Sequence, residues 1–206
     1  GLFNNLADSA EIYDAVFDFR GPCSEHDKDF TYWNCSGGLA DRNYGHIHDV
    51  QINYRGGGSY ANRDFGLLFR WNTVSGIIEN FVVGNVPDEG ENGFTAYTTC
   101  GLLCGTNYGT IRSGYIYGED IFTDTSNYSA GTKIYVGGVC GSASTTSKIE
   151  NVYSLVNIIV ADPDRSESKS AYNSLYAAIV GNDAGHTRNS FSVGMSTFTA
   201  PFGGKT

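Results

Sequence analysis

The sequence is poor in the residues that build long helices or bind polyanions. It has only 4 Pro and 1 Met in 206 residues, and Ala, Leu, Lys and Glu do not dominate, so we expect no long helices. No run of about 18 apolar residues occurs, so we expect no membrane span. Lys and Arg number 13 against 22 Asp and Glu, and the net charge of −9 disfavours nucleic acid and anionic lipid as partners.

Familiar catalytic and metal-binding motifs are also missing from the sequence. The Ser and Thr residues have no nucleophile-elbow context, and no Gly-rich phosphate loop opens a helix. The His-Glu-x-x-His zinc signature of metallopeptidases is absent, as are calcium-binding nonapeptide repeats. The 5 Cys have no metal-knuckle spacing. We therefore expect no catalytic residues, no cofactor-binding residues, no metal ligands and no enzymatic activity.

The abundant residues favour an all-β chain that is rich in turns. The sequence has 27 Gly, 14 Tyr and 12 Phe. Gly, Asn and Ser suit turns, whereas aromatic and β-branched residues suit strands. The length suffices for one domain with a sizeable core, so we expect residues 1–206 to form a single domain. The chain starts at Gly1 without Met or a signal-peptide pattern, and we expect it to be a piece of a longer polypeptide.

One pattern recurs six times along the chain. The stretch GLLCGTNYGTIRSGYIYGEDI, from Gly101 to Ile121, resembles stretches that begin at Gly66 and Gly137. Each unit opens with a small residue, and an apolar residue follows two positions later. The opening residues are Gly1, Gly37, Gly66, Gly101, Gly137 and Ala177. The apolar residues are Phe3, Leu39, Leu68, Leu103, Val139 and Ile179.

A second signature follows in each unit: an apolar residue, any residue, and then Asn, Asp or Ser. It occupies Ile12/Asp14, Ile47/Asp49, Ile78/Asn80, Ile111/Ser113, Ile149/Asn151 and, with Thr in the apolar slot, Thr187/Asn189. Polar turns that contain Gly separate the two signatures, and they begin at Asn43, Asn72, Asn107 and Asp183. Asn or Asp at a repeated turn can bond the backbone and tolerate the left-handed conformation. Stacked Asn side chains can also bond each other between coils.

These units predict a right-handed parallel β-solenoid of about six coils. Short apolar runs that are broken by Gly and Asn are typical of strands rather than of helices. Stacking in register would bury the first-signature apolar residues in one column and the second-signature Ile residues in another. Six coils at about 4.8 Å each would make a rod about 29 Å long. The parallel-crossover rule predicts the right-handed winding.

The units resemble GLUG-motif repeats, which are named for their Gly-Leu start. GLLCGTNYGTIRSGYIYG is similar to that motif over its full length, and the units at Gly66 and Gly137 are nearly as similar. The units at Gly1, Gly37 and Ala177 are degenerate. Such repeats occur in secreted or surface proteins, including non-catalytic regions of IgA-specific metallopeptidases and adhesins. The resemblance therefore implies a β-solenoid in an extracellular setting, and it carries over no catalytic residue.

The length variation falls in one slot, after the second signature and before the next opening residue. The inserts cover residues 21–36, 53–65, 87–100, 122–136 and 161–176. Repeat proteins often bind along the face that carries their insertions. Aromatic residues of the inserts would then form a contact face for a protein or a carbohydrate, with Trp33, Tyr60, Tyr97 and Tyr128 as candidates. The alternative is that each insert ends in a third strand whose aromatic residues pack inward.

Two His residues on one strand raise the possibility of a metal site. His46 and His48 flank Ile47, so both should point away from the core, where a pair of imidazoles can hold a metal. His186 has the same repeat position as His46, but four coil steps separate the two by about 19 Å. We therefore expect these His residues to be exposed polar residues rather than ligands.

The Cys residues allow two disulfides. Cys104 and Cys140 hold the same repeat position in adjacent coils, and a Cα separation of about 4.8 Å permits a disulfide or a pair of stacked buried thiols. Cys23 and Cys35 bracket the first insert, and a bridge between them would close it as a loop.

We expect a structural or adhesive extracellular module that acts as a rigid spacer or contact surface. Sequons at Asn34 and Asn127 are compatible with glycosylation in that setting. One alternative is a filament-forming subunit that assembles end to end with copies of itself, because an open coil end exposes unpaired strand edges. Another is a polysaccharide-active β-helix enzyme, or the non-catalytic region of a secreted peptidase.

Overall fold

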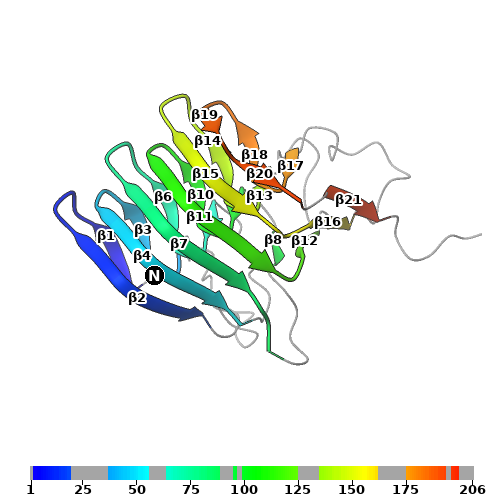
Figure 1. Ribbon diagram of the computed structural model, residues 1–206, viewed down its shortest axis with the longest axis horizontal. Coiled ribbons are helices and arrows are strands. Elements are labelled where there is room, and N and C mark those ends of the chain that lie inside the picture. Colours follow the sequence, from blue (N-terminus) through cyan, green and yellow to red (C-terminus); the bar gives the residue numbers. More distant parts are fainter. Residues whose placement is uncertain are drawn as a thin grey trace, which may run out of the picture.

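The protein is built from parallel β-strands throughout its described part. The computed structural model describes residues 2–19, 37–55, 64–88, 95–96, 99–124, 135–161, 175–193 and 196–199. No helix occurs in these residues, and hence none that is long and apolar enough to cross a bilayer. The strands stack as a β-solenoid, which confirms the all-β parallel architecture. Figure 1 shows the successive coils side by side along the molecule.

Two large sheets form the walls of the solenoid. The six-stranded sheet contains, in order, β1 (Phe3–Leu6), β3 (Ala40–Asn43), β6 (Phe69–Asn72), β10 (Cys104–Asn107), β14 (Cys140–Ala143) and β18 (Val180–Asp183). The seven-stranded sheet contains β2 (Glu11–Phe19), β4 (His46–Tyr54), β7 (Ile77–Asn85), β11 (Thr110–Gly118), β15 (Lys148–Ser154) and β19 (His186–Arg188), and β20 (Phe191–Ser192) also pairs with β15.

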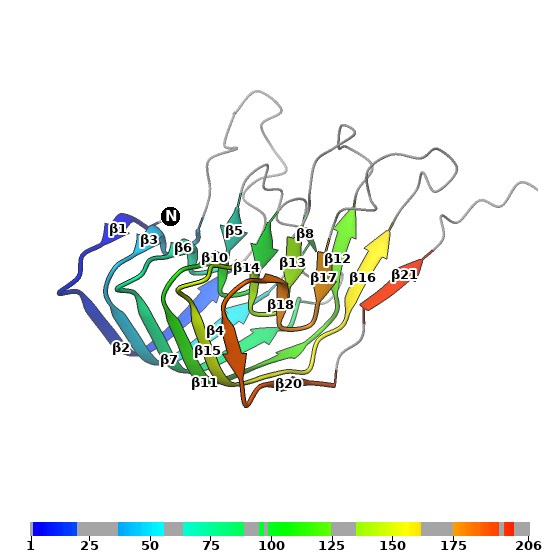
Figure 2. The ribbon, with the colours of Figure 1, turned by 90° about the horizontal axis from the view of Figure 1, so that it is seen from above.

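Two smaller sheets complete the coils. One contains β5 (Phe65–Gly66), β9 (Cys100–Gly101), β13 (Tyr135–Gly137) and β17 (Leu175–Ala177). The other contains β8 (Thr95–Ala96), β12 (Ile121–Asp124), β16 (Ile158–Ala161) and β21 (Ser196–Thr199). Because each of these sheets has only four strands, the solenoid has about four turns rather than the expected six. Figure 2 shows the smaller sheets beside the larger ones.

The predicted registers of the repeat are confirmed by the strand pairing. Gly66 pairs with Gly101, Gly101 with Gly137, and Gly137 with Ala177. Gly is required in this column because a Cβ atom on Gly101 would lie 2.3 Å from the Cα atom of Cys140, which belongs to the neighbouring coil. The second-signature residues Ile47, Ile78, Ile111 and Ile149 also pair in sequence and are fully buried.

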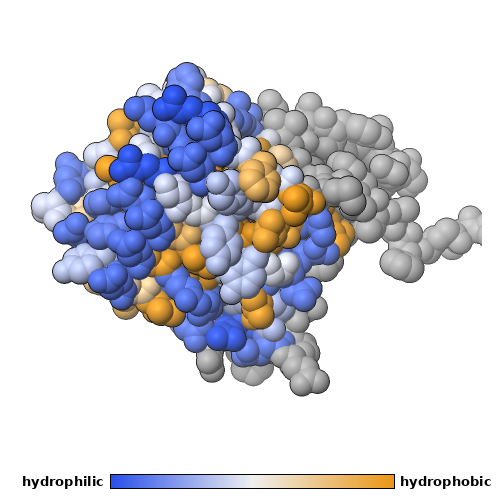
Figure 3. Space-filling model, in the orientation of Figure 1, coloured by the Kyte–Doolittle hydropathy of each residue, from blue (hydrophilic) through white to orange (hydrophobic). Residues whose placement is uncertain are grey.

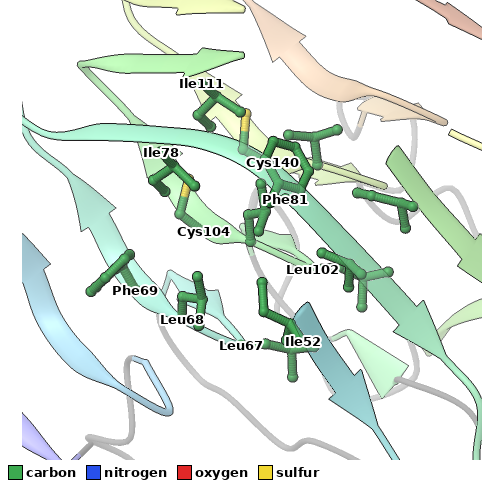
Figure 4. Packing of buried hydrophobic residues seen from close by; sticks show 14 of the residues in the cluster. Ile52, Leu67, Leu68, Phe69, Ile78, Phe81, Leu102, Cys104, Ile111 and Cys140 are labelled. Carbon is green, nitrogen blue, oxygen red and sulfur yellow. The ribbon is translucent and has the colours of Figure 1, made fainter. Parts of the chain in front are cut away.

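The first-signature apolar residues form the other interior column, with one exception. Leu68, Leu103 and Val139 are fully buried, and the main-chain N–H of each donates to its neighbour in the next coil. Figure 4 shows Leu68 and Leu102 packing near Ile78 and Phe81 from the facing sheet. The placement of Phe3 in this column is wrong, because Phe3 is 46% exposed.

The exception has a simple cause. Phe3 pairs with Ala40 in the next strand, and Ala40 lies one residue beyond the column residue Leu39. The first unit is therefore shifted by one residue relative to the others at this point. β1 is also the terminal strand of its sheet, so no described coil covers its outer edge.

The last residue of the second signature has a left-handed backbone in every unit. The φ angles are 51° at Asp14, 54° at Asp49, 52° at Asn80, 57° at Ser113, 55° at Asn151 and 50° at Asn189. The first five of these residues lie inside the long strands rather than in the turns, and Asn189 lies between β19 and β20. The pairing passes over them, since His48 pairs with Glu79 and Val50 with Phe81. As a result, two consecutive side chains point outward between two buried ones.

The turn Asn residues form a buried ladder between coils, as expected from their stacking. Asn43 donates from Nδ2 to Asn72 Oδ1 at 2.9 Å, and Asn72 donates from Nδ2 to Asn107 Oδ1 at 2.8 Å. All three side chains are fully buried. The main-chain N–H of Gly45 donates to Asn43 Oδ1, and that of Gly109 donates to Asn107 Oδ1. The ladder therefore satisfies turn amides that the interior would otherwise leave unpaired.

Candidate functional site

Most of the candidate residues from the sequence lie outside the described residues. They are the contact-face candidates Trp33, Tyr60, Tyr97 and Tyr128, the cysteines Cys23 and Cys35, and the sequon residues Asn34 and Asn127. These candidates remain predictions.

Cys104 and Cys140 are described, and they stack in register as expected. They pair directly between β10 and β14. Both are buried free thiols in the structure. The hydrogen bond with Cys104, together with burial, raises the pKa of the Cys140 thiol well above its ordinary value. Because the thiolate is the reactive form, Cys140 is poorly suited to act as a nucleophile.

The chain after the inserts returns as a third sheet, made of β5, β9, β13 and β17. At the two ends of the 53–65 insert, Tyr54 is 2% exposed and Phe65 is 6% exposed. These two aromatic residues pack inward, as the packing alternative expects. Four of the described aromatic residues that face solvent, Tyr13, Tyr115, Tyr153 and Phe191, lie instead on the seven-stranded sheet.

The outer face of the seven-stranded sheet carries a row of charges that alternate in sign. The row consists of the middle residue of the second signature in the second to sixth units: His48, Glu79, Arg112, Glu150 and Arg188. Arg112 donates from Nε to Glu79 Oε2, and Arg188 donates from Nε to Glu150 Oε1 at 2.9 Å. The hydrogen bond from Arg112 lowers the pKa of Glu79. Exposed ion pairs of this kind add little stability, but they fix the orientation of the side chains.

One end of this row forms a cluster of His and carboxylate groups, which we call the His–Glu cluster. Its members are Glu11 on β2, His46 and His48 on β4, and their partners Asp49 and Glu79. Glu11 lies directly opposite His46 in the strand register. The facing atoms of Glu11, His46 and His48 all lie within 4.8 Å of one another. The two His ring centroids are 4.5 Å apart.

Each imidazole in the His–Glu cluster has one ring nitrogen that faces Glu11 and a second that faces another carboxylate. His48 Nε2 lies 3.1 Å from Glu11 Oε1, and its Nδ1 lies 2.6 Å from Asp49 Oδ2. His46 Nδ1 lies 3.9 Å from Glu11 Oε1, and its Nε2 lies 2.7 Å from Glu79 Oε1. The hydrogen bonds with Asp49 and Glu11 raise the pKa of His48, and the bond with His48 lowers the pKa of Asp49.

The other end of the same face carries exposed aromatic and apolar side chains, which we call the aromatic patch. The patch consists of Tyr115, Tyr153, Leu155, Phe191 and Val193, and the half-buried Tyr117 lies beside Tyr115. Tyr115 pairs with Tyr153, and Tyr153 pairs with Phe191, so three rings lie on three successive strands. These rings are 42%, 39% and 55% exposed. Figure 3 shows hydrophobic and pale atoms gathered on this face, where Figure 1 places β11, β15 and β20.

A shallow depression adjoins the charged row at the last coil. It has a volume of about 460 Å³ and is lined by Lys148, Glu150, Asp183, Gly185, His186, Thr187 and Arg188. Its lining side chains are charged or polar, and Glu150 and Arg188 are already paired with each other. The depression therefore lacks the apolar lining of a typical small-molecule site.

Both surface features have a signal in the sequence that belongs to no known motif. The His–Glu cluster and the charged row occupy the two positions that flank the signature Ile. The aromatic patch includes the residue four positions after the signature apolar slot, as in Ile111/Tyr115, Ile149/Tyr153 and Thr187/Phe191. Both rows are visible in an alignment of the six units at this signature.

The chain matches no protein-family model, no curated protein and no solved structure. The resemblance to GLUG-motif repeats thus rests on the motif residues alone.

Proposed function

We propose that the chain is a non-catalytic contact module of an extracellular or surface protein, and that it binds a neutral polysaccharide on the aromatic patch. The solenoid holds the patch on a rigid sheet, and the coils on either side act as a spacer. The single observation that carries this proposal is the line of three exposed rings on successive strands, Tyr115, Tyr153 and Phe191.

A linear polymer suits this arrangement better than a small molecule. Rings on adjacent strands are spaced at about 4.8 Å along the solenoid axis, so they form a line on an open surface. The C–H faces of sugar rings stack on aromatic side chains, and Tyr adds a hydroxyl group for hydrogen bonds. The patch lies on the outer face of a sheet and not in a pocket. Both ends of the line of rings are therefore open to a long chain.

The charge of the protein favours a neutral polymer over an anionic one. The net charge is −9, and the two Arg residues of the charged row, Arg112 and Arg188, are paired with carboxylates. An acidic polysaccharide would be repelled by this surface. Cross-strand aromatic pairs also stabilise a sheet, so a test must separate binding from stability.

Affinity electrophoresis in gels that contain a soluble neutral glucan tests the proposal. Hydroxyethyl cellulose is the probe, and polygalacturonate is the anionic comparison. We expect the neutral glucan to retard the wild-type protein and Tyr153→Ala to weaken binding about 30-fold, the effect of losing a central anchor. Tyr108→Ala is the matched control, since Tyr108 is exposed at 36% but lies outside the patch. Urea denaturation of each variant reports any loss of stability.

Three outcomes contradict the proposal. One is equal retardation of wild type and the folded Tyr153→Ala variant. Another is tighter binding to polygalacturonate than to the neutral glucan. The third is the release of reducing sugars from the glucan by the wild-type protein, which would make the chain an enzyme. If the patch binds a protein and no glucan, then the ligand of the patch is a protein and not a polysaccharide.

End-to-end assembly is a second candidate role. β1 and β2 are the terminal strands of their sheets, and no described strand pairs with their outer edges. Such an edge can pair with another strand, including one from a second copy of the chain. Sedimentation velocity over a hundredfold range of concentration would show a growing species if copies stack. A constant monomer mass over that range would contradict this role.

A further inference from the structure

We propose that Glu11, His46 and His48 bind one zinc ion, which cross-links β2 to β4 on the outer face of the seven-stranded sheet. This inference is independent of the aromatic patch and of the proposed polysaccharide. It revises the expectation that the two His residues are merely exposed polar residues. The new observation is the carboxylate of Glu11, which comes from the neighbouring coil and lies opposite His46.

The distances between the three side chains suit a tetrahedral zinc ion. Glu11 Oε1 lies 3.1 Å from His48 Nε2 and 3.9 Å from His46 Nδ1. A zinc ion with bonds of about 2.0–2.1 Å spaces its ligand atoms about 3.3 Å apart in tetrahedral geometry. The side chain of Glu11 is 56% exposed and is free to adjust by the difference. Two His nitrogens and one carboxylate leave a fourth position for water.

The hydrogen bonds behind the two imidazoles orient them for a metal. His46 faces Glu79 with Nε2 at 2.7 Å, and His48 faces Asp49 with Nδ1 at 2.6 Å. A carboxylate in this place takes the N–H of the ring and leaves a lone pair on the opposite nitrogen. The lone pairs of both rings then lie on the side of Glu11. Carboxylates behind metal-binding His residues are a general feature of zinc sites.

Neighbouring groups hold these orienting partners in place. Arg112 donates to Glu79 Oε2, which leaves Oε1 for His46. The ring of Tyr13 stacks on His48 with an interplanar angle of 10° and a centroid distance of 5.3 Å. Residues of β2 and β11 therefore hold the arrangement in place before any ion arrives.

The local charge also favours a divalent cation. The carboxylates of Glu11, Asp49 and Glu79 are opposed by one guanidinium, that of Arg112, when both imidazoles are neutral. Two lone pairs and a carboxylate that face one another repel unless a cation lies between them. Zinc can supply that charge, and so can a proton on each ring, so the test must distinguish the metal from protonated histidines.

The test uses full-length, untagged protein that has been freed of metal with a chelator. Isothermal titration with zinc chloride should show one equivalent bound. His48→Gln and Glu11→Gln should each weaken binding at least tenfold, and Asp49→Asn should weaken it about tenfold through the orienting bond. Asn is a suitable replacement at this left-handed position because three other coils have Asn there. His186→Gln is the matched control, since His186 has the repeat position of His46 but is not in a described metal-binding group.

Two further measurements identify the geometry and the structural effect. Cobalt should give the intense visible absorption of a tetrahedral site in the wild type and not in His48→Gln. Zinc should raise the Tm of the wild type and of His186→Gln, because an ion that binds only the folded state stabilises it. The same addition should leave the Tm of His48→Gln and Glu11→Gln unchanged.

The proposal is overturned if zinc binds with less than one equivalent or if its affinity is the same in wild type, His48→Gln and Glu11→Gln. Binding that survives both substitutions would belong to other residues, such as His26, which lies outside the described part of the chain. A cobalt spectrum typical of octahedral coordination, with no change in Tm, would also count against it. In those cases the cluster is a set of protonated His–carboxylate pairs.

Discussion

The buried Asn ladder offers the sharpest test of how the coils are held together. Asn72 is its central member: it accepts a hydrogen bond from Asn43 Nδ2 and donates one to Asn107 Oδ1. Replacing Asn72 with Ala removes both bonds, and it also removes the contacts from Asn72 Nδ2 to the main-chain carbonyls of Gly76 and Thr110, whereas the backbone conformation can persist. We expect this single change to destabilise the protein far more than an Asn→Ala change on the surface.

The size of the effect follows from what each partner loses. The Asn43 amide N–H that pointed at Asn72 becomes a buried donor without an acceptor, which costs about 1–3 kcal/mol. Asn107 Oδ1 keeps the N–H of Gly109, so losing the second bond costs only about 0.5–1.5 kcal/mol. The sum for these two partners is about 1.5–4.5 kcal/mol, a large part of the stability of a typical domain.

Urea denaturation followed by far-UV circular dichroism measures this loss. Asn53→Ala is the matched control, because the side chain of Asn53 bonds only Gln51 on the surface and its loss should cost less than about 0.5 kcal/mol. The slopes of the transitions should agree, so that the midpoints report stability. If the free energies of unfolding of the two variants agree within about 0.5 kcal/mol, the ladder does not stabilise the stack as we infer.

Four further changes test other parts of the repeat. Leu103→Asp should unfold the protein, because it buries an unpaired charge at a cost above about 4 kcal/mol; an unchanged far-UV spectrum would contradict the column. Gly101→Ala should cost about 1–3 kcal/mol in urea denaturation, since its Cβ would lie 2.3 Å from the Cα of Cys140. Asn151→Val should cost about 1–3 kcal/mol because of its φ of 55°, whereas Asn151→Gly should be nearly neutral. The raised pKa of the Cys140 thiol predicts slow alkylation by iodoacetamide in the folded protein and fast alkylation after unfolding, measured by mass spectrometry.

The repeat made most of the fold predictable from sequence. The two signatures place residues of like environment at fixed positions, and stacking is the one arrangement that buries all of them together. The columns through Leu68 and Ile78 follow from this directly. The error at Phe3 arose where the first unit departs from the others by one residue, because a degenerate unit supplies too few matches to fix its register. The number of turns was overestimated because six signatures do not require six complete coils.

The surface features were harder to foresee because they depend on pairs of strands. The sequence shows His46 and His48 as a pair on one strand, but two imidazoles without a third ligand do not predict a metal site. Glu11 becomes their neighbour only through the pairing of β2 with β4. The roles of Asp49 and Glu79 depend on which ring nitrogen each one meets, and no linear pattern contains that information. The contact residues were predicted in the inserts for a similar reason. In the sequence, an exposed aromatic residue of a strand looks the same as a core residue.

The left-handed residue in each long strand connects the fold to both surface rows. In a regular strand the side chains alternate, so the neighbour of an outward residue points inward. At Asp49 the positive φ interrupts this alternation, and His48 and Asp49 point outward together between the buried residues Ile47 and Val50. This is what allows the carboxylate of Asp49 to reach Nδ1 of the residue before it. The same bend recurs in every coil, so the outward position before it stacks into a row of alternating charge, and the outward position two residues after it stacks into the line of rings. A feature that first shows itself as a packing signature therefore also determines which side chains the solenoid presents to a partner.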